Sequence, residues 1–298
     1  MRPIRVFRPA SLVVVALVLA PVFAACGSGS AGGSTAGTTT AASTSATTAP
    51  PATTVTTAPV PTTISSNVYF LRNEVVSPVA REVTPPAVAR GAMTALLQGP
   101  SAAERAAGLT SSIPAGTTLR GLRVARGIAY VDLSSGFESG GGSVSMLTRV
   151  AQVVHTLTWF PSVHAVRFLI DGVAVSAIGG EGVIVDHPLT RADVEGQAPA
   201  ILVESPLEGA SASSPLVVRG TANVFEAVLH LRLVDDTGAV LAQRRVMATS
   251  GTGTRGTFSA SLVFRISSAR DATLTAFERS AADGSPVNTV SLGLHLRP

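Results

Sequence analysis

The sequence predicts a mixed α/β domain followed by a β-sandwich, with a leader and a long uncharged segment in front of them. Between residues 68 and 182, short apolar runs alternate with two stretches of helical spacing. From residue 201 onward there is no helical period, and short runs of alternating polarity are separated by turn residues. A chain of 298 residues is long enough for two domains with sizeable cores.

The leader, residues 1–25, has the composition of a secretory signal peptide. Its first ten residues carry three arginines and no acidic residue, and residues 12–25 form an apolar run interrupted only by Pro21. Fourteen residues are too few for a membrane-spanning helix, which needs about 20. The small residues Ala24 and Ala25 precede Cys26, the only cysteine, in a pattern that resembles a lipobox.

In signals of that kind a peptidase cleaves before the cysteine and the thiol is acylated. We therefore expect cleavage between Ala25 and Cys26, and anchoring to membrane lipid through acylated Cys26 on the extracytoplasmic face of the cell membrane. Phe23 departs from the pattern, because a leucine is usual at the third position before the cysteine of a lipobox. The alternative is an ordinary signal peptide that leaves a free thiol at Cys26, in an oxidising compartment.

Residues 26–67 contain no charged residue and consist mainly of Ser, Thr, Ala, Gly and Pro, which predicts a disordered tether. The pI of 10.4 overstates the charge of the mature chain. Removal of the leader leaves 19 arginines against 18 acidic residues, and no basic run remains. We therefore expect no nucleic-acid partner.

The first domain is expected to span residues 68–182 in the order β-α-β-β-α-β, with a mixed sheet and two helices. The helices are expected from Thr84-Pro85-Pro86 to Gln98, and after Gly140–Ser143 up to Pro161. The second helix has one apolar face, made of Met146, Leu147, Val150, Val153, Val154, Leu157 and Phe160. The strands are expected at residues 68–71, 119–124, 128–133, 166–170 and 173–178.

Residues 183–200, with Pro188 and Pro199, are expected to be a linker, and residues 201–298 a sandwich of about seven short strands. Turn residues separate the apolar runs at Asp236-Thr237-Gly238, Thr252-Gly253-Thr254 and Asp283-Gly284.

Several motifs of the first domain, in order, resemble the GerMN domain. They are Ala95-Leu96-Leu97-Gln98-Gly99-Pro100, Gly108-Leu109-Thr110-Ser111-Ser112-Ile113-Pro114, Val131-Asp132-Leu133-Ser134, residues 156–163 and Ile170-Asp171-Gly172. GerMN domains are known from spore-germination and sporulation lipoproteins and from the actinobacterial lipoprotein LpqB. The propeller that follows GerMN in LpqB-type proteins has no counterpart in this sequence.

The second domain resembles the immunoglobulin-like domain that often accompanies GerMN. The residues that carry this resemblance are Glu204-Ser205-Pro206, Ser214-Pro215-Leu216, residues 220–227 and Phe277-Glu278. The two resemblances imply a location in the cell envelope and a role in assembly or regulation, with no established enzymatic chemistry and no cofactor.

Candidate catalytic residues have simpler structural interpretations. Asp132 and Asp171 could form a carboxylate pair, but Asp132 ends a predicted strand and Asp171 opens a glycine turn. Gly140–Ser143 before a helix could cradle an anion, but no nucleotide-binding motif accompanies it. Ser143 lies in no nucleophile elbow.

His155 and His164 are the only histidines of the first domain, and we expect His155 at the edge of the helix's core face. No spacing of His, Cys or carboxylate residues predicts a metal site. In the second domain, strand alternation at Phe225-Glu226 and Phe277-Glu278 predicts that the phenylalanines lie inside, while the place of the glutamates stays open. The alternative is an exposed edge that docks a protein.

The sequence thus predicts a non-enzymatic, membrane-anchored envelope lipoprotein that acts as an interaction, assembly or regulatory module with an envelope protein partner. The alternative is a protein that binds cell-wall glycan (peptidoglycan) through aromatic side chains. The sequence equips it thinly, because its only tryptophan and tyrosines are Trp159, Tyr69 and Tyr130. A wall hydrolase lacks any candidate constellation.

Overall fold

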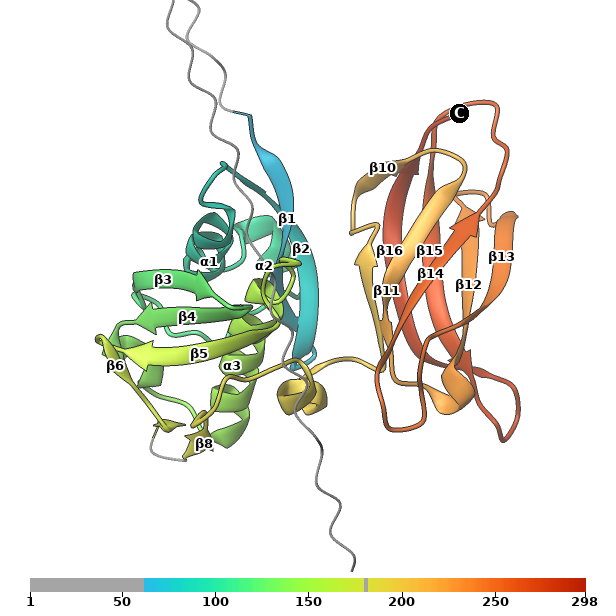
Figure 1. Ribbon diagram of the computed structural model, residues 1–298. Coiled ribbons are helices and arrows are strands. Elements are labelled where there is room, and N and C mark those ends of the chain that lie inside the picture. Colours follow the sequence, from blue (N-terminus) through green and yellow to red (C-terminus); the bar gives the residue numbers. More distant parts are fainter. Residues whose placement is uncertain (1–61, 180–181) are drawn as a thin grey trace, which may run out of the picture. The chain divides into compact units, whose positions relative to one another are not determined.

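The structure is a computed structural model that describes residues 62–179 and 182–298 (Figure 1). The predicted signal peptide, the predicted lipid site at Cys26 and nearly all of the predicted tether lie outside these residues. The described residues belong to one compact unit. None of their helices has both the length and the apolar character needed to cross a membrane.

The first domain begins with an antiparallel hairpin of β1 (Ile64–Arg72) and β2 (Val75–Val83). The sequence predicts the first strand but not the second, where a break is expected. Pro78 lies inside β2 and cannot donate to a ladder. It is tolerated because the ladder to β1 is the only one that β2 forms among the described strands.

The helices of this domain differ from the prediction in number and in capping. Helix α1 (Val88–Gln98) ends at Gln98 as predicted, and Gly99 follows it with φ 78°. It begins after Ala87 with no side-chain cap, so the predicted cap in Thr84-Pro85-Pro86 is wrong. A short third helix, α2 (Ala102–Ala106), was not expected, although Ser101 and Glu104 form a capping box in front of it.

The predicted mixed sheet is confirmed. Its strand order is β3-β4-β5-β6, with β4 and β5 parallel and the other pairs antiparallel. Its strands are β3 (Leu119–Ala125), β4 (Ile128–Leu133), β5 (Ala165–Ile170) and β6 (Val173–Ala174). The run predicted as a single strand over residues 173–178 is divided, because β7 (Ala177–Ile178) pairs instead with β8 (Val183–Ile184).

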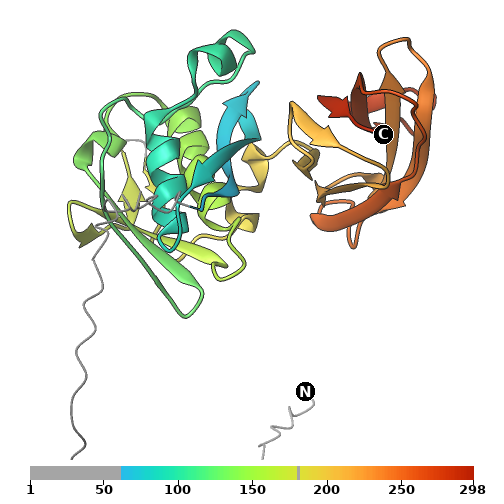
Figure 2. The same ribbon diagram turned by 90° about the horizontal axis from the view of Figure 1, so that it is seen from above.

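Helix α3 (Ser143–Leu157) connects the parallel strands β4 and β5 and is buried on all sides in its second half. The sequence predicts one apolar face, yet the polar residues of the opposite face are buried too: Thr148, Arg149, Gln152, His155 and Thr156. The reason is that α3 packs against several elements at once, among them α1, β1 and β5. Figure 2 shows α1 and α3 side by side.

Residues 183–200, expected to be a linker, contribute to the core of the first domain. Val185, Leu189 and Val194 are buried in it, and the main chains of Leu189 and Val166 exchange two hydrogen bonds of 2.8 Å. A 3₁₀ helix, η2 (Ala192–Gln197), follows. The limits given above for the two domains stay a prediction.

The second domain is the predicted sandwich. One sheet has the order β10-β16-β15-β12-β13 and the other β14-β11-β9. The strands are β9 (Ile201–Ser205), β10 (Ala210–Ala212), β11 (Leu216–Ala222), β12 (Val228–Asp235), β13 (Val240–Met247), β14 (Gly256–Leu262), β15 (Arg270–Arg279) and β16 (Pro286–Leu296).

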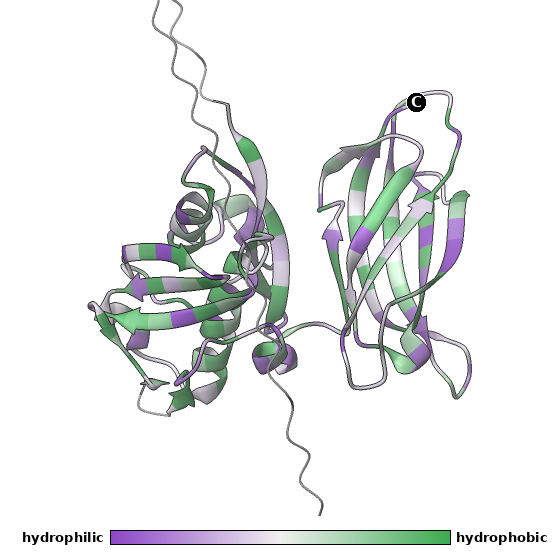
Figure 3. Cartoon of the chain, viewed as in Figure 1, coloured by the Kyte–Doolittle hydropathy of each residue, from purple (hydrophilic) through white to green (hydrophobic). Residues whose placement is uncertain are grey.

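Alternation of polar and apolar residues explains the core of the sandwich. On β12 the fully buried residues are Leu229, Leu231 and Leu233, and the residues between them are more exposed. The same alternation on β11 and β14 supplies the facing layer (Figure 3). The two sheets therefore pack through their apolar faces.

Candidate functional site at the junction of the two domains

The buried polar face of α3 fixes the position of β1. The Gln152 side chain donates to the carbonyl of Tyr69 at 3.1 Å and accepts from the backbone N–H of Ser112 at 3.0 Å. The hydroxyl of Thr156 accepts from the N–H of Tyr69 at 3.1 Å. Backbone groups of β1 that would otherwise lack partners are thus satisfied by side chains of the helix.

The Tyr69 side chain reaches from β1 to the second domain, where it joins a cluster with Arg191 and Glu204. The phenol donates a short hydrogen bond to Glu204. Arg191 donates to the same carboxylate at 2.7 Å and to the hydroxyl of Thr158 at 2.8 Å. The side chains of Arg191 and Glu204 are only 21% and 11% exposed, so each charge depends on the other for compensation.

A β-bulge explains why Glu204 points toward the first domain. In the pairing of β9 with β11, Ser205 lies opposite Arg219 and Val203 opposite Gly220, so Glu204 has no partner residue. A bulge of this kind turns the extra side chain out of the regular alternation. The carboxylate of Glu204 can therefore meet Tyr69 instead of facing the sandwich.

Close approach of the two strands at this bulge requires glycine at position 220. A Cβ on Gly220 would lie 2.1 Å from the carbonyl oxygen of Leu202, a backbone atom that cannot move aside. On the other side of β9, the Asn67 amide donates to the carbonyl of Glu204 at 2.9 Å. Both contacts fix the backbone that carries Glu204.

Burial determines the protonation of the two rings next to this cluster. Burial, aided by the nearby Glu204 carboxylate, raises the pKa of the Tyr69 phenol, which remains a hydrogen-bond donor. His155 lies against Tyr69 with ring centroids 5.3 Å apart. Burial, and then the charges of Arg191 and Arg255, hold the pKa of His155 well below its usual range, so the ring is neutral. Neither of its nitrogens has a hydrogen-bond partner among the described residues.

A second tie joins the 183–200 segment to the sandwich. Arg255 contacts Glu195 at 2.8 Å and donates to the carbonyl of Pro199 at 2.7 Å. The Asn223 amide donates to the other oxygen of Glu195 at 2.9 Å. Arg255 is 11% exposed, so this pair too is largely shielded from solvent. The two domains are therefore joined by two separate sets of charged groups.

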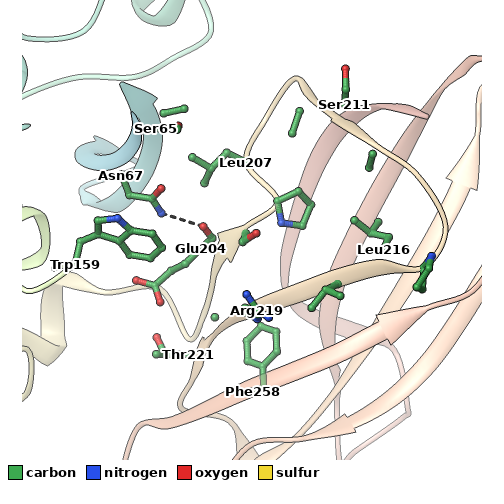
Figure 4. Close-up of a pocket in the computed structure, with 18 of the residues that line it drawn as sticks. Ser65, Asn67, Trp159, Glu204, Leu207, Ser211, Leu216, Arg219, Thr221 and Phe258 are labelled. Carbon is green, nitrogen blue, oxygen red and sulfur yellow. Dashed lines mark hydrogen bonds between the residues drawn. The ribbon is translucent and has the colours of Figure 1, made fainter. Parts of the chain in front are cut away.

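An open groove of about 780 Å³ lies beside the Tyr69 cluster. Figure 4 shows Trp159 and Asn67 on one side of it, Leu216, Arg219 and Phe258 on the other, and Glu204 between them. The lining also includes short hydroxyl side chains, Ser65, Ser205, Ser211, Ser213, Thr221 and Thr257, and apolar ones, among them Pro206, Leu207, Pro215 and Val217. The groove thus combines an indole, a guanidinium and small polar groups with a largely apolar wall.

The charges in the groove are not balanced. Glu204 is neutralised by Arg191, whereas Arg219 is exposed and has no ion pair or hydrogen bond with any residue in the described ranges. Val218 and Gly220 face the sandwich core, so the alternation of β11 directs Arg219 away from it. One uncompensated positive charge is therefore available at this surface.

The structure does not bring Asp132 and Asp171 together as a reacting pair. Asp132 accepts from the N–H of Gly172 at 2.9 Å, and Asp171 forms an exposed ion pair with Arg120 at 2.5 Å. Both carboxylates thus stabilise the turn between β5 and β6, which agrees with the structural interpretation of their positions.

The segment that leads into the Gly140–Ser143 loop presents carbonyl groups to Arg149. The buried guanidinium of Arg149 donates to the carbonyls of Phe137, Ser139 and Gly140 at 2.5, 3.1 and 3.0 Å. His164 is exposed, whereas His155 is buried. No three His, Cys, Asp or Glu side chains gather as a metal site would need anywhere in residues 62–179 or 182–298.

The prediction that both phenylalanines lie inside the sandwich is wrong for Phe225. Its side chain is 56% exposed, in a 3₁₀ turn, η3 (Phe225–Ala227), where the strand alternation does not apply. Phe277 is 5% exposed but stacks on His230 outside the main core. Glu278 accepts from the backbone N–H of Phe225 at 2.8 Å, so the two Phe-Glu pairs are neighbours.

Comparison with protein families identifies both domains. Residues 67–176 match Germane, described as sporulation and spore germination, and residues 200–285 match Gmad2, the immunoglobulin-like domain of bacterial spore germination. The chain carries a Germane domain followed by a Gmad2 domain. The GerMN and immunoglobulin-like resemblances of the sequence are thereby confirmed.

Three solved structures are similar to parts of the chain. A provisionally assigned lipoprotein of Clostridium perfringens is 21% identical over 46% of this chain and 93% of its own, with a TM-score of 0.34. The tandem GerMN domains of the sporulation protein GerM from Bacillus subtilis are 16% identical over 68% of this chain and 62% of their own, with a TM-score of 0.40. The first of those GerMN domains alone is 22% identical over 43% of this chain and 98% of its own, with a TM-score of 0.36. No curated protein matches the chain.

Proposed function

We propose that this protein is a non-enzymatic lipoprotein of the cell envelope, anchored outside the cytoplasmic membrane through acylated Cys26. Its Germane and Gmad2 domains together form a docking platform for an envelope protein. The descriptions of the two families, which concern sporulation and germination and name no reaction, support this proposal.

The exposed Phe225 is the observation that carries the docking function. The turn that presents it contains two successive non-glycine residues with positive φ, Glu226 at 52° and Ala227 at 59°. Such conformations cost about 1–3 kcal/mol each and are often found at functional sites. The turn is held in place by Glu278 and by Gly251, where a Cβ would come within 2.5 Å of the Ala227 nitrogen.

An exposed aromatic side chain on a rigid turn is a suitable anchor for a protein interface, where aromatic residues provide much of the binding energy. The charged cluster at the domain junction supports the same function, because it keeps the two domains in one arrangement. Residues of both domains can then contribute to a single interface without a further ordering cost.

Proximity labelling in living cells tests the proposal, with a labelling enzyme fused to the C-terminus of the full chain. We expect a defined set of envelope proteins to be labelled by the wild type and labelled several-fold less by Phe225→Ser. Val263→Ser is the matched control, because Val263 is 71% exposed on the same sandwich outside the Phe225 turn. Equal labelling by Phe225→Ser and the wild type would contradict the docking function.

Anchoring is tested separately by metabolic labelling with an alkyne fatty acid. We expect the label on the membrane-associated wild type and its absence from Cys26→Ser, which should be released from membranes. A mature chain with an unmodified Cys26 thiol would refute the lipoprotein assignment, and it would leave the result of the Phe225 experiment standing.

A further inference from the structure

The groove beside the Tyr69 cluster is an open cavity of ligand size. Its volume, about 780 Å³, lies within the range of about 300–1,000 Å³ that is usual for small-molecule sites. The protein-docking proposal does not use it, because Phe225 is not among the groove's lining residues.

The indole of Trp159 determines which kind of ligand fits one wall of this groove. Trp159 directly follows Thr158, which accepts the hydrogen bond from Arg191, so the end of α3 is fixed where the indole begins. The indole is half-buried, and its N–H forms no hydrogen bond to the described part of the chain. A flat apolar face beside a free donor suits a pyranose ring, which has an apolar C–H face and hydroxyls at its edge.

Arg219 determines the charge of the ligand. Its guanidinium is the one uncompensated charge in the lining, since Arg191 neutralises Glu204. A planar guanidinium matches a carboxylate with two parallel hydrogen bonds. A nucleic acid or another polyphosphate would need several cations along its path, and this groove offers one.

The remaining lining mixes hydroxyl side chains with apolar ones, of which Leu207, Leu216, Val217 and Phe258 are the larger. Serine and threonine hydroxyls can both donate and accept, as hydroxylated ligands require.

We propose that this groove binds a carbohydrate that carries a carboxylate, with a sugar ring on the indole of Trp159 and the carboxylate on the guanidinium of Arg219. The ligand is a second partner of the molecule, in addition to the docked protein, and its binding does not depend on that docking. An extracytoplasmic location would place the groove next to acidic wall glycan.

The full folded chain offers a direct test, because Trp159 is its only tryptophan and its fluorescence reports on the groove. The first probe is a soluble peptidoglycan glycan fragment whose stem peptides have been removed by hydrolysis of the amide bond, which frees the carboxylate of its muramic acid residues. The second is chitotetraose, a similar glycan without carboxylates. The third is hexaglutamate, an acidic peptide.

We expect a saturable change of Trp159 fluorescence with the muramic acid fragment and at least tenfold weaker binding of chitotetraose. Arg219→Gln should weaken binding of the fragment about tenfold, whereas Arg232→Gln should leave it unchanged. Arg232 is the matched control, an exposed strand arginine on the outer face of the other sheet. Calorimetry with Trp159→Leu should show a similar or larger loss.

Three results would overturn the proposal: no fluorescence change with the muramic acid fragment, equal binding of chitotetraose, or tighter binding of hexaglutamate. Circular dichroism of each variant shows whether the fold is intact. Since Arg219 and Arg232 are both exposed and form no ion pair among the described residues, neither substitution should disturb it. Failure of this test would leave the labelling experiments on Phe225 and Cys26 unaffected.

Discussion

The two domains fill their interiors in different ways. The sandwich buries mostly leucine, valine, alanine and phenylalanine, and its buried charge, Asp235, lies at the end of β12, where it holds a turn and pairs with Arg270 at 2.8 Å. In the first domain the most buried helix also buries a row of polar side chains, among them Arg149 and Gln152. An apolar core tolerates exchange of similar residues, whereas a polar network works in one arrangement only.

This contrast shows which residues fix the position of the groove and the junction. The polar groups of α3 fix β1, and β1 carries Tyr69 and Asn67, which contact Glu204 of the sandwich. The sandwich contributes stability through burial of apolar surface, which has no preferred direction. The arrangement of groove and junction therefore depends mainly on buried polar side chains.

The largest effect is expected in the sandwich core. Leu274→Ala removes a side chain that is fully buried and should lower the free energy of unfolding by about 4 kcal/mol, because it loses apolar contacts and leaves a cavity. Urea denaturation followed by circular dichroism measures this loss. A loss below about 1 kcal/mol would mean that the apolar core is not the main source of stability in the sandwich.

The regular elements are the part of the fold that the sequence predicts well. Leucines at every second position predict β12 almost to the residue, and Gly99-Pro100 predicts the end of α1. The strand β2 escapes prediction because Ser77-Pro78 interrupts its apolar pattern. Only its pairing with β1 in the hairpin reveals that this segment is extended.

The junction could not be predicted, for physical reasons. Helical spacing shows which face of α3 is apolar, but only tertiary packing decides whether the other face meets water. No local pattern marks the bulge at Glu204, since Ile201-Leu202-Val203 shows no alternation. One usable signal was Tyr69 inside the apolar run of residues 68–71, because a buried phenol needs a hydrogen-bond partner.

A smaller effect is expected when the junction is broken. Glu204→Leu leaves the Arg191 charge without its carboxylate and should lower the free energy of unfolding by about 2–3 kcal/mol, somewhat less than a fully buried pair would lose. Denaturation followed by Trp159 fluorescence measures it. Tyr69→Phe, which removes one hydroxyl and keeps the ion pair, should cost only about 1 kcal/mol. Equal losses in both variants would show that the charge itself contributes little.

The smallest change in stability, and the one of opposite sign, is expected at His155. His155→Leu replaces a buried ring whose nitrogens lack partners among the described residues, so it should raise the free energy of unfolding at pH 7.5 by about 1 kcal/mol. The gain is partly offset by the lost ring contact with Tyr69.

The same substitution should change the response to pH. Burial and the facing charges of Arg191 and Arg255 depress the pKa of His155, so below about pH 6.5 the unfolded chain binds a proton that the folded chain does not. The free energy of unfolding of the wild type must therefore fall as the pH is lowered, and this group accounts for a loss of about 1.4 kcal/mol between pH 7.5 and 5.5. His155→Leu removes that contribution, and the difference in unfolding free energy between variant and wild type should widen by this amount. If the difference stays constant over this range, the ring is protonated in the folded protein and the buried junction is more polar than its contacts indicate.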